Sequence, residues 1–142
     1  MTEADRIIKQ LQLASHPEGG HYRQTWIADP AAPGARAAGT CIYFLLKAGE
    51  HSHWHRVDAA EIWHFYAGAP LILSISETEA GPRRDLTLGS DLGSGQEPQL
   101  IVPPHHWQKA ETTGDYTLVG CTVSPGFQFE RFTLAPPGFD IP

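Results

Sequence analysis

Fourteen glycines and twelve prolines are spread along this 142-residue chain, and they limit its possible folds more than any other feature. Both residue types interrupt helices, so a chain punctuated this often favours short strands joined by turns over a helical bundle. With 41% apolar residues, a chain of this length can bury a core without disulfides or a structural metal. We therefore expect one domain over residues 1–142.

The segments between these breaks have the character of strands. Alternation of side chains predicts a strand over 22–27, and later strand-like runs lie at 41–46, 61–66, 71–76, 99–102, 116–123 and 127–134. Helical segments do not alternate with these runs, which argues against a parallel α/β sheet. The pattern predicts an all-β antiparallel sandwich or jelly roll, with the barrel core over 40–135.

The segment 1–39 precedes this core. Apolar residues recur at helical spacing between positions 3 and 13, and Thr2 with Asp5 has the pattern of a capping box at a helix start. We expect a short N-terminal helix, then the strand over 22–27 packed on the outside of the barrel, and a loop before the core begins.

Charge and cysteine content exclude several classes of partner. Ten basic and sixteen acidic residues give a net charge of −6, the wrong sign for a protein that neutralises nucleic-acid phosphates. No apolar run approaches the roughly 18 residues of a membrane span, and the first residues lack a signal-peptide pattern. Cys41 and Cys121 lie among apolar neighbours, where reduced cysteine acts as a small hydrophobe. We expect a cytoplasmic protein without nucleic-acid or membrane partners.

Histidine and tryptophan concentrate in two windows, which contain His51, His53, Trp54, His55, Trp63 and His64, and then His105, His106 and Trp107. Alternate side chains of a strand share a face, so His53 and His55 can converge on one point. With Glu61 they form a ligand set suited to iron, zinc, nickel or manganese. The alternative is a polar strand end in solvent, with Glu61 paired to a base such as Arg56.

The spacing of Gly49, His53, His55, Glu61 and Gly68 resembles the first motif of the cupin superfamily. This resemblance implies a double-stranded β-helix (jelly-roll) barrel whose end binds a divalent metal through the two histidines and the glutamate. Five residues separate the second histidine from the glutamate, a longer gap than cupins usually have, so a longer turn or a bulge is expected there.

The second cupin motif is represented by residues 103–108. Gln108 stands where cupins place their last histidine ligand, and an amide oxygen binds such metals more weakly than imidazole does. The resemblance therefore implies a metal set of His53, His55, Glu61 and Gln108.

A closer resemblance covers nearly the whole chain. It is to the fifth cupin family, small proteins with an epimerase-like barrel and no settled biochemical function, and its segments are 16–23, 42–46, 54–56, 61–66, 102–103, 107–108, 118–123 and 125–127. It carries onto this chain Glu18, Arg23, His55, Glu61, Trp63, His64, Trp107 and Gln108. The family implies a homodimer, which unpaired edges at the N-terminal strand and around Phe127, Phe129 and Phe132 also favour.

We assign a role to each candidate in one predicted cavity. His55 and Glu61 are the catalytic acid–base candidates, while Arg23, Trp63, Trp107 and Gln108 are the ligand-binding candidates. Each has a structural alternative, because barrel tryptophans are more often core and Arg23 can pair internally with Glu18. His64 has the opposite strand parity from Glu61 and is expected to point away from the cavity.

Three functions remain open at this level. The first is a pocket that binds a small polar metabolite, sugar-like or nucleotide-like, with isomerase or epimerase acid–base chemistry. The second is a metal-dependent enzyme that uses His53, His55 and Glu61. The third is a non-catalytic module that binds a metabolite.

Overall fold

The computed structural model describes residues 1–142. In chain order its elements are α1 (Glu3–Leu11), β1 (Ala14–Ser15), β2 (His21–Ile27), β3 (Thr40–Lys47), β4 (His51–Val57), β5 (Ala60–Gly68), β6 (Leu71–Ser76), β7 (Arg84–Leu88), β8 (Gln99–Val102), β9 (Trp107–Thr112), β10 (Tyr116–Ser124) and β11 (Phe132–Leu134), with short 3-10 helices at Leu92–Ser94 and Phe129–Arg131. None of these helices is long and apolar enough to cross a membrane.

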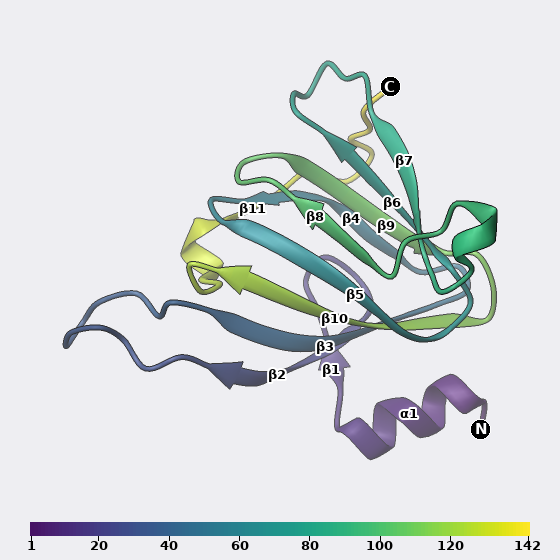
Figure 1. Ribbon diagram of the computed structural model, residues 1–142, viewed down its shortest axis with the longest axis horizontal. Helices are drawn as coiled ribbons and strands as arrows, with labels where there is room; N and C mark the ends of the chain where they lie inside the picture. The colour runs from purple at the N-terminus through teal and green to yellow at the C-terminus, as the bar shows by residue number, and fades with distance from the viewer.

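The strands form two antiparallel sheets that pack against each other (Figure 1). The six-stranded sheet has the order β1-β2-β3-β10-β5-β8, and the five-stranded sheet has the order β11-β4-β9-β6-β7. Strands that are distant in sequence are neighbours in each sheet, as in a jelly roll. The predicted all-β jelly-roll architecture with a short N-terminal helix is therefore confirmed.

The N-terminal helix is held at its start and along one face. The hydroxyl of Thr2 accepts the backbone N–H of Asp5, and the carboxylate of Asp5 accepts the backbone N–H of Thr2, which completes the predicted capping box. The helix lies beside the six-stranded sheet, outside the space between the two sheets (Figure 1), and Ala4 and Leu13 pack with Leu45 of β3. This packing leaves the inner face of the sheet free for the core.

The predicted strand over 22–27 exists, but it does not pack on the outside of the barrel. β2 pairs with β3 along nearly its whole length and so extends the six-stranded sheet. Its residues Tyr22 and Gln24 consequently face the space between the sheets, where they line a cavity.

The strand predicted over 127–134 is mostly absent. Phe129–Arg131 is a 3-10 helix, and only Phe132–Leu134 pairs, with β4. Phe127, Phe129 and Phe132 stack edge to face on one another, with ring centroids 4.9 to 6.1 Å apart. Aromatic packing has replaced the strand alternation that the sequence suggested.

Two further strands, β7 and β9, were not predicted because they contain few apolar residues. Each borders β6, whose apolar side chains supply most of that part of the core. A polar strand can thus be stabilised by pairing with an apolar neighbour, a long-range effect that a local pattern does not reveal.

The space between the sheets is apolar at one end and polar at the other. Phe44, Trp63, Leu73 and Val119 are among the buried residues of the apolar end. A separate cluster lies on the far face of the five-stranded sheet, where the C-terminal residues Ala135 and Ile141 cover Trp54 and Trp107. The polar end of the space holds the candidate site.

Candidate functional site

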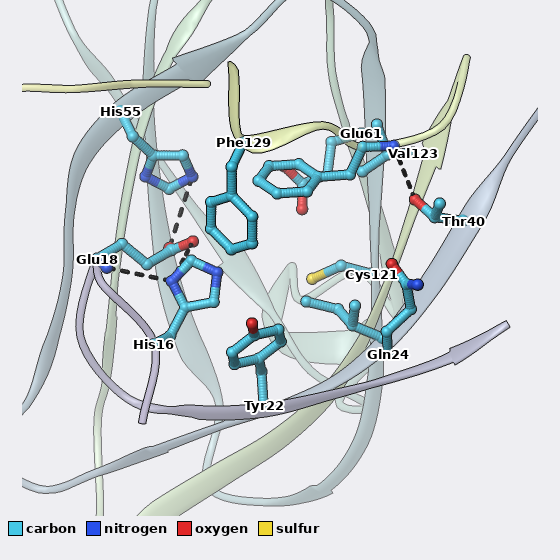
Figure 2. Close-up of a pocket in the computed structure, with 12 residues that line it drawn as sticks. His16, Glu18, Tyr22, Gln24, Thr40, His55, Glu61, Cys121, Val123 and Phe129 are labelled. Carbon is cyan, nitrogen blue, oxygen red and sulfur yellow. Dashed lines mark hydrogen bonds and ion pairs between the residues drawn. The ribbon is translucent and has the colours of Figure 1, made fainter. Parts of the chain in front are cut away.

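A cavity of about 260 Å³ opens at the polar end of the barrel (Figure 2). Its walls come from the loop before β2 and from β2, β3, β4, β5, β10 and the segment after β10, which contribute His16, Glu18, Tyr22, Gln24, Thr40, Ile42, His55, Glu61, Cys121, Val123, Phe127 and Phe129. Half of these residues are hydrophobic, so the polar groups of the cavity lie beside apolar walls.

A β-bulge in β4 decides which of its side chains enter the cavity. Ser52 pairs with Ala110 of β9, but His55 pairs with Gln108, so β4 has one more residue than its partner in this stretch. The extra residue reverses the alternation of side chains. Ser52 and His55 are buried, and both contact Glu18.

His53 is consequently directed out of the cavity, although it lies two residues from His55. Its Nε2 atom lies 3.0 Å from the backbone carbonyl of Pro136, in the C-terminal segment. The prediction that His53 and His55 converge was therefore wrong, because it assumed a strand without a bulge.

Glu18 reaches the cavity on the tight loop between β1 and β2. The backbone carbonyl of Glu18 accepts the N–H of His53 at 2.8 Å, which fixes the loop to β4. Gly19 has φ of +109°, and a Cβ there would overlap the His51 carbonyl oxygen. Only glycine allows this close approach, so Gly19 shapes the turn that delivers Glu18.

The hydrogen bonds around Glu18 define the proton positions on both neighbouring histidines. The backbone N–H of Glu18 donates to His16 Nδ1 at 3.1 Å, so this nitrogen is an acceptor and the ring proton lies on Nε2. His55 Nδ1 lies 2.7 Å from the His53 carbonyl, which can only accept, so His55 carries its proton on Nδ1. The unprotonated nitrogen of each ring therefore faces Glu18, and that of His16 already accepts the Glu18 backbone N–H.

The Glu18 carboxyl lies between these two acceptors. Oε1 is 3.3 Å from His16 Nδ1, Oε2 is 3.5 Å from His55 Nε2, and Ser52 Oγ donates to Oε2. The lone pair of His16 Nδ1 already accepts the Glu18 backbone N–H, so a carboxyl group that keeps its proton would donate it to His55 Nε2, whereas a carboxylate would face an unprotonated nitrogen on either side. The geometry thus favours the neutral acid.

Glu61 is held by a buried chain of hydrogen bonds. The indole N–H of Trp63 is a donor only, so it donates to Gln108 Oε1, at 2.8 Å. The amide nitrogen of Gln108 must then face Glu61, and it donates to Oε1 at 2.8 Å. Trp63 thereby orients Gln108, and Gln108 orients the carboxyl that enters the cavity.

Burial places both carboxyl groups near neutral pKa values. Desolvation raises the pKa of Glu18 from 4.5 to about 8, opposed by the hydrogen bond from Ser52. Desolvation also raises the pKa of Glu61 from 4.5 to about 7, where the attraction of His55 opposes it and the charge of Glu18 adds to it. Two groups poised in this range can each give or take a proton at physiological pH.

The histidines respond to burial in the opposite direction. Desolvation, with a smaller contribution from the neighbouring His55, lowers the pKa of His16 from 6.5 to about 4. Desolvation also lowers the pKa of His55, although the charge of Glu61 raises it. Both rings are therefore neutral at physiological pH, which agrees with the acceptor nitrogens identified above.

The structure brings together only part of the predicted site. His55 and Glu61 line the cavity, and Gln108 supports it from behind, fully buried. Trp63 lies in the core and reaches the site only through Gln108. It does not line the cavity as a ligand-binding residue.

Two predicted ligand-binding residues lie elsewhere. Trp107 has the opposite strand parity from Gln108, so it faces the far side of its sheet, against Phe139 and under Arg56. Arg23 is exposed on the outer face of β2, with its guanidinium 5.8 Å from the centre of the Tyr43 ring. Neither side chain contributes to the cavity wall.

Several lining residues were not predicted from the sequence. The resemblance included Glu18, but as a possible partner of Arg23, and His16, Tyr22 and Cys121 were given no role. The signal for Glu18 was the pair of glycines that follows it, which marks a sharp turn. Nothing local to the sequence indicates that this turn folds over β4.

The predicted metal ligands do not fit a divalent ion. His53 points away, and both polar atoms of the Gln108 side chain are already engaged by Trp63 and Glu61. No group of three or more His, Cys, Asp or Glu side chains has an arrangement that could hold a metal ion. The donor set left in the cavity is better suited to moving protons.

Residues 5–135 match the family model described as Cupin superfamily (DUF985). A solved structure of protein SO0799 from Shewanella oneidensis is 41% identical and has a TM-score of 0.88, with 95% of this chain and 85% of that chain covered. A hypothetical protein from Leishmania major is 30% identical with a TM-score of 0.86, and covers 97% of this chain and 90% of its own.

More distant structures share the fold alone. Oxalate decarboxylase from Bacillus subtilis is 14% identical with a TM-score of 0.63, over 84% of this chain and 29% of that chain. No curated protein matches the chain significantly.

Proposed function

Since the chain belongs to the DUF985 family of the cupin superfamily, we propose that its barrel cavity binds a small polar metabolite and catalyses proton transfer on it, as isomerases and epimerases do. One observation carries the proposal. Two buried carboxyl groups, Glu18 and Glu61, share a cavity with the neutral ring of His55, and burial holds both carboxyl pKa values near neutrality.

The proposed step uses one carboxyl as base and the other as acid. Ionised Glu61 removes a proton from a carbon of the ligand, and the electron pair of the broken C–H bond stays on the ligand. Neutral Glu18 supplies a proton to Nε2 of His55, which passes it to a second position of the ligand, where the new bond forms. The ligand keeps its formula, and one proton has moved from Glu18 to Glu61.

The two supporting contacts have separate parts in this step. Gln108 donates to Glu61 and so favours the ionised base over the acid. The His53 carbonyl holds the Nδ1 proton of His55, which leaves Nε2 free to receive and return a proton. Exchange with solvent through the cavity mouth restores the starting protonation.

The test follows solvent deuterium into the ligand. The protein is incubated in D₂O with separate sugars, amino sugars, nucleotide sugars, hydroxyketones and amino alcohols, and proton NMR follows loss of individual C–H signals. An isomerase or epimerase exchanges the proton that it removes with solvent deuterium, even when the ligand returns to its starting form. We expect exchange with at least one compound, and its loss in Glu61→Gln.

Glu79→Gln is the matched control, because Glu79 is an exposed residue far from the cavity lining. It should exchange protons as the unchanged protein does. Binding of a compound without exchange would instead support the non-catalytic module. Exchange that survives in Glu61→Gln would refute the assigned base.

We also propose that the protein is a homodimer. Trp26 and Ile27, at the end of β2, are 55% and 57% exposed, and Phe129 at the cavity mouth is 46% exposed. Beyond its two-residue pairing with β1, β2 is an edge strand whose outer hydrogen-bonding groups are unpaired. A second copy could cover this edge and these side chains together.

A further inference from the structure

We propose that the ligand of this cavity is a small organic cation, an amine or ammonium compound that also carries a hydroxyl or carbonyl oxygen. This inference rests on the proposed function and adds to it the chemical class of the substrate. It follows from the charges, the aromatic walls and one unpaired hydrogen-bond donor within the cavity.

The cavity contains acidic side chains and neutral histidines, and it has no basic side chain that is charged at neutral pH. Glu18 and Glu61 are both buried there, and no lysine or arginine lines the walls. An anionic ligand such as a phosphate would therefore enter without a countercharge, beside two carboxyl groups that must both stay protonated. A cation would meet two groups able to become carboxylates.

The aromatic side chains suit the same ligand. Tyr22, Phe127 and Phe129 line the cavity, and Figure 2 shows the Tyr22 and Phe129 rings on opposite sides of it. Ring faces attract cations, most strongly where water is excluded. A positively charged group in this space would thus be attracted by aromatic rings as well as by carboxylates.

An unpaired donor indicates what else the ligand carries. His16 is only 8% exposed, and its Nδ1 is occupied by the backbone N–H of Glu18. Its Nε2–H has no hydrogen-bond partner within the protein, and Figure 2 shows this nitrogen directed into the cavity. This N–H faces the cavity and not a protein acceptor, so a ligand oxygen placed there can accept it.

The protonation of the empty site gives the proposal a measurable signature. With pKa values of about 8 and about 7, the two carboxyls hold protons at neutral pH that a bound cation would displace. Binding of a permanent cation should release about one proton, and its affinity should rise several-fold per pH unit below about pH 8. A neutral ligand of the same shape should show no such dependence.

The experiment uses three probes of nearly equal shape. Choline is a permanent cation with a hydroxyl, 3,3-dimethylbutan-1-ol is its neutral counterpart, and 3,3-dimethylbutyrate is an anion. Binding is measured on the ¹⁵N-labelled full chain by amide chemical shifts, at several pH values between about 6 and about 8.5. We expect choline to bind tightest, with affinity that rises with pH.

Two variants assign the effect to the cavity. Glu61→Gln should weaken choline binding at least about fivefold and leave the neutral probe unchanged, because it removes one carboxylate from the site. Glu18→Gln is a second test if the first variant does not fold, as judged by its amide spectrum. Glu79→Gln, far from the cavity, should bind all three probes as the unchanged protein does.

Specific outcomes would overturn the inference. Equal or tighter binding of the neutral or anionic probe, choline affinity that does not change with pH, or no binding of choline at all would each do so. None of these outcomes affects the deuterium-exchange test, which covers neutral and anionic compounds. Conversely, choline binding without any proton exchange would leave the ligand class standing and remove the catalytic proposal.

Discussion

Replacing Glu18 with glutamine should stabilise the protein at neutral and alkaline pH. In the folded chain the Glu18 carboxyl keeps its proton up to about pH 8, whereas in the unfolded chain it releases this proton near its ordinary pKa of 4.5. Between these values the folded state binds more protons than the unfolded state. The stability that this protonated carboxyl contributes is therefore fully present below pH 4.5 and is lost as the pH rises towards 8.

The size of this loss follows from the interval between the two pKa values. Each pH unit above 4.5 costs about 1.4 kcal/mol, so the folded protein loses about 3 kcal/mol by pH 7. Glutamine has no proton to release and so avoids the loss. Ser52 and His55 both contact the same oxygen of Glu18, Oε2, so an NH₂ group at this position can donate to His55 Nε2 and to the Ser52 hydroxyl.

The assay is urea denaturation of the Glu18→Gln variant and the unchanged protein at intervals from about pH 5 to about pH 8.5. The difference in unfolding free energy should grow by about 1.4 kcal/mol per pH unit and level off near the raised pKa of about 8. The pKa of His16 is lowered from 6.5 to about 4, so the folded state loses stability as the pH falls below 6.5. Both proteins contain His16, so this loss cancels in the comparison. A difference that does not change with pH would refute the buried, protonated carboxyl.

Other predictions test the surroundings of the site. Gln108→Leu should destabilise the protein by about 2–4 kcal/mol in urea denaturation, because it leaves the Trp63 N–H and Glu61 unpaired in the interior; an unchanged midpoint would contradict this hydrogen-bond chain. Trp107→Ala should cost about 3–5 kcal/mol while choline affinity stays unchanged, and loss of binding in the folded variant would contradict its place on the far face. Light scattering at micromolar concentration should give the mass of a dimer, and a monomeric mass would refute the proposed interface.

The features that depend on residues close together in the sequence were the most predictable part of the structure. The capping box at Thr2, the strands from 40 onwards with strong apolar character and the fold class depend on local patterns, and the structure has them. His55 and Glu61 were also identified, since both belong to a motif whose spacing can be read directly. Polar strands such as β9 were not predicted, because pairing with neighbouring strands stabilises them more than their own residues do.

The arrangement of the site depended on features that no local pattern contains. Alternation along 51–55 predicted that His53 and His55 share a face, and a single extra residue opposite β9 reverses that result. The register between two strands is set by the packing of whole sheets, so the bulge could not be located from β4 alone. The same alternation, applied to Trp107 and Gln108, decides that only one of them supports the cavity.

Strand alternation, turns and a spaced motif are local properties, and they were enough to predict an all-β jelly roll with histidine and glutamate near one end. The position of Glu18 depends instead on packing between distant segments. This residue comes from a loop before the barrel core, and it lies between His16 and His55 and close enough to Glu61 to raise the pKa of Glu61. Desolvation makes these side chains chemically useful, and it exists only when distant segments enclose them together.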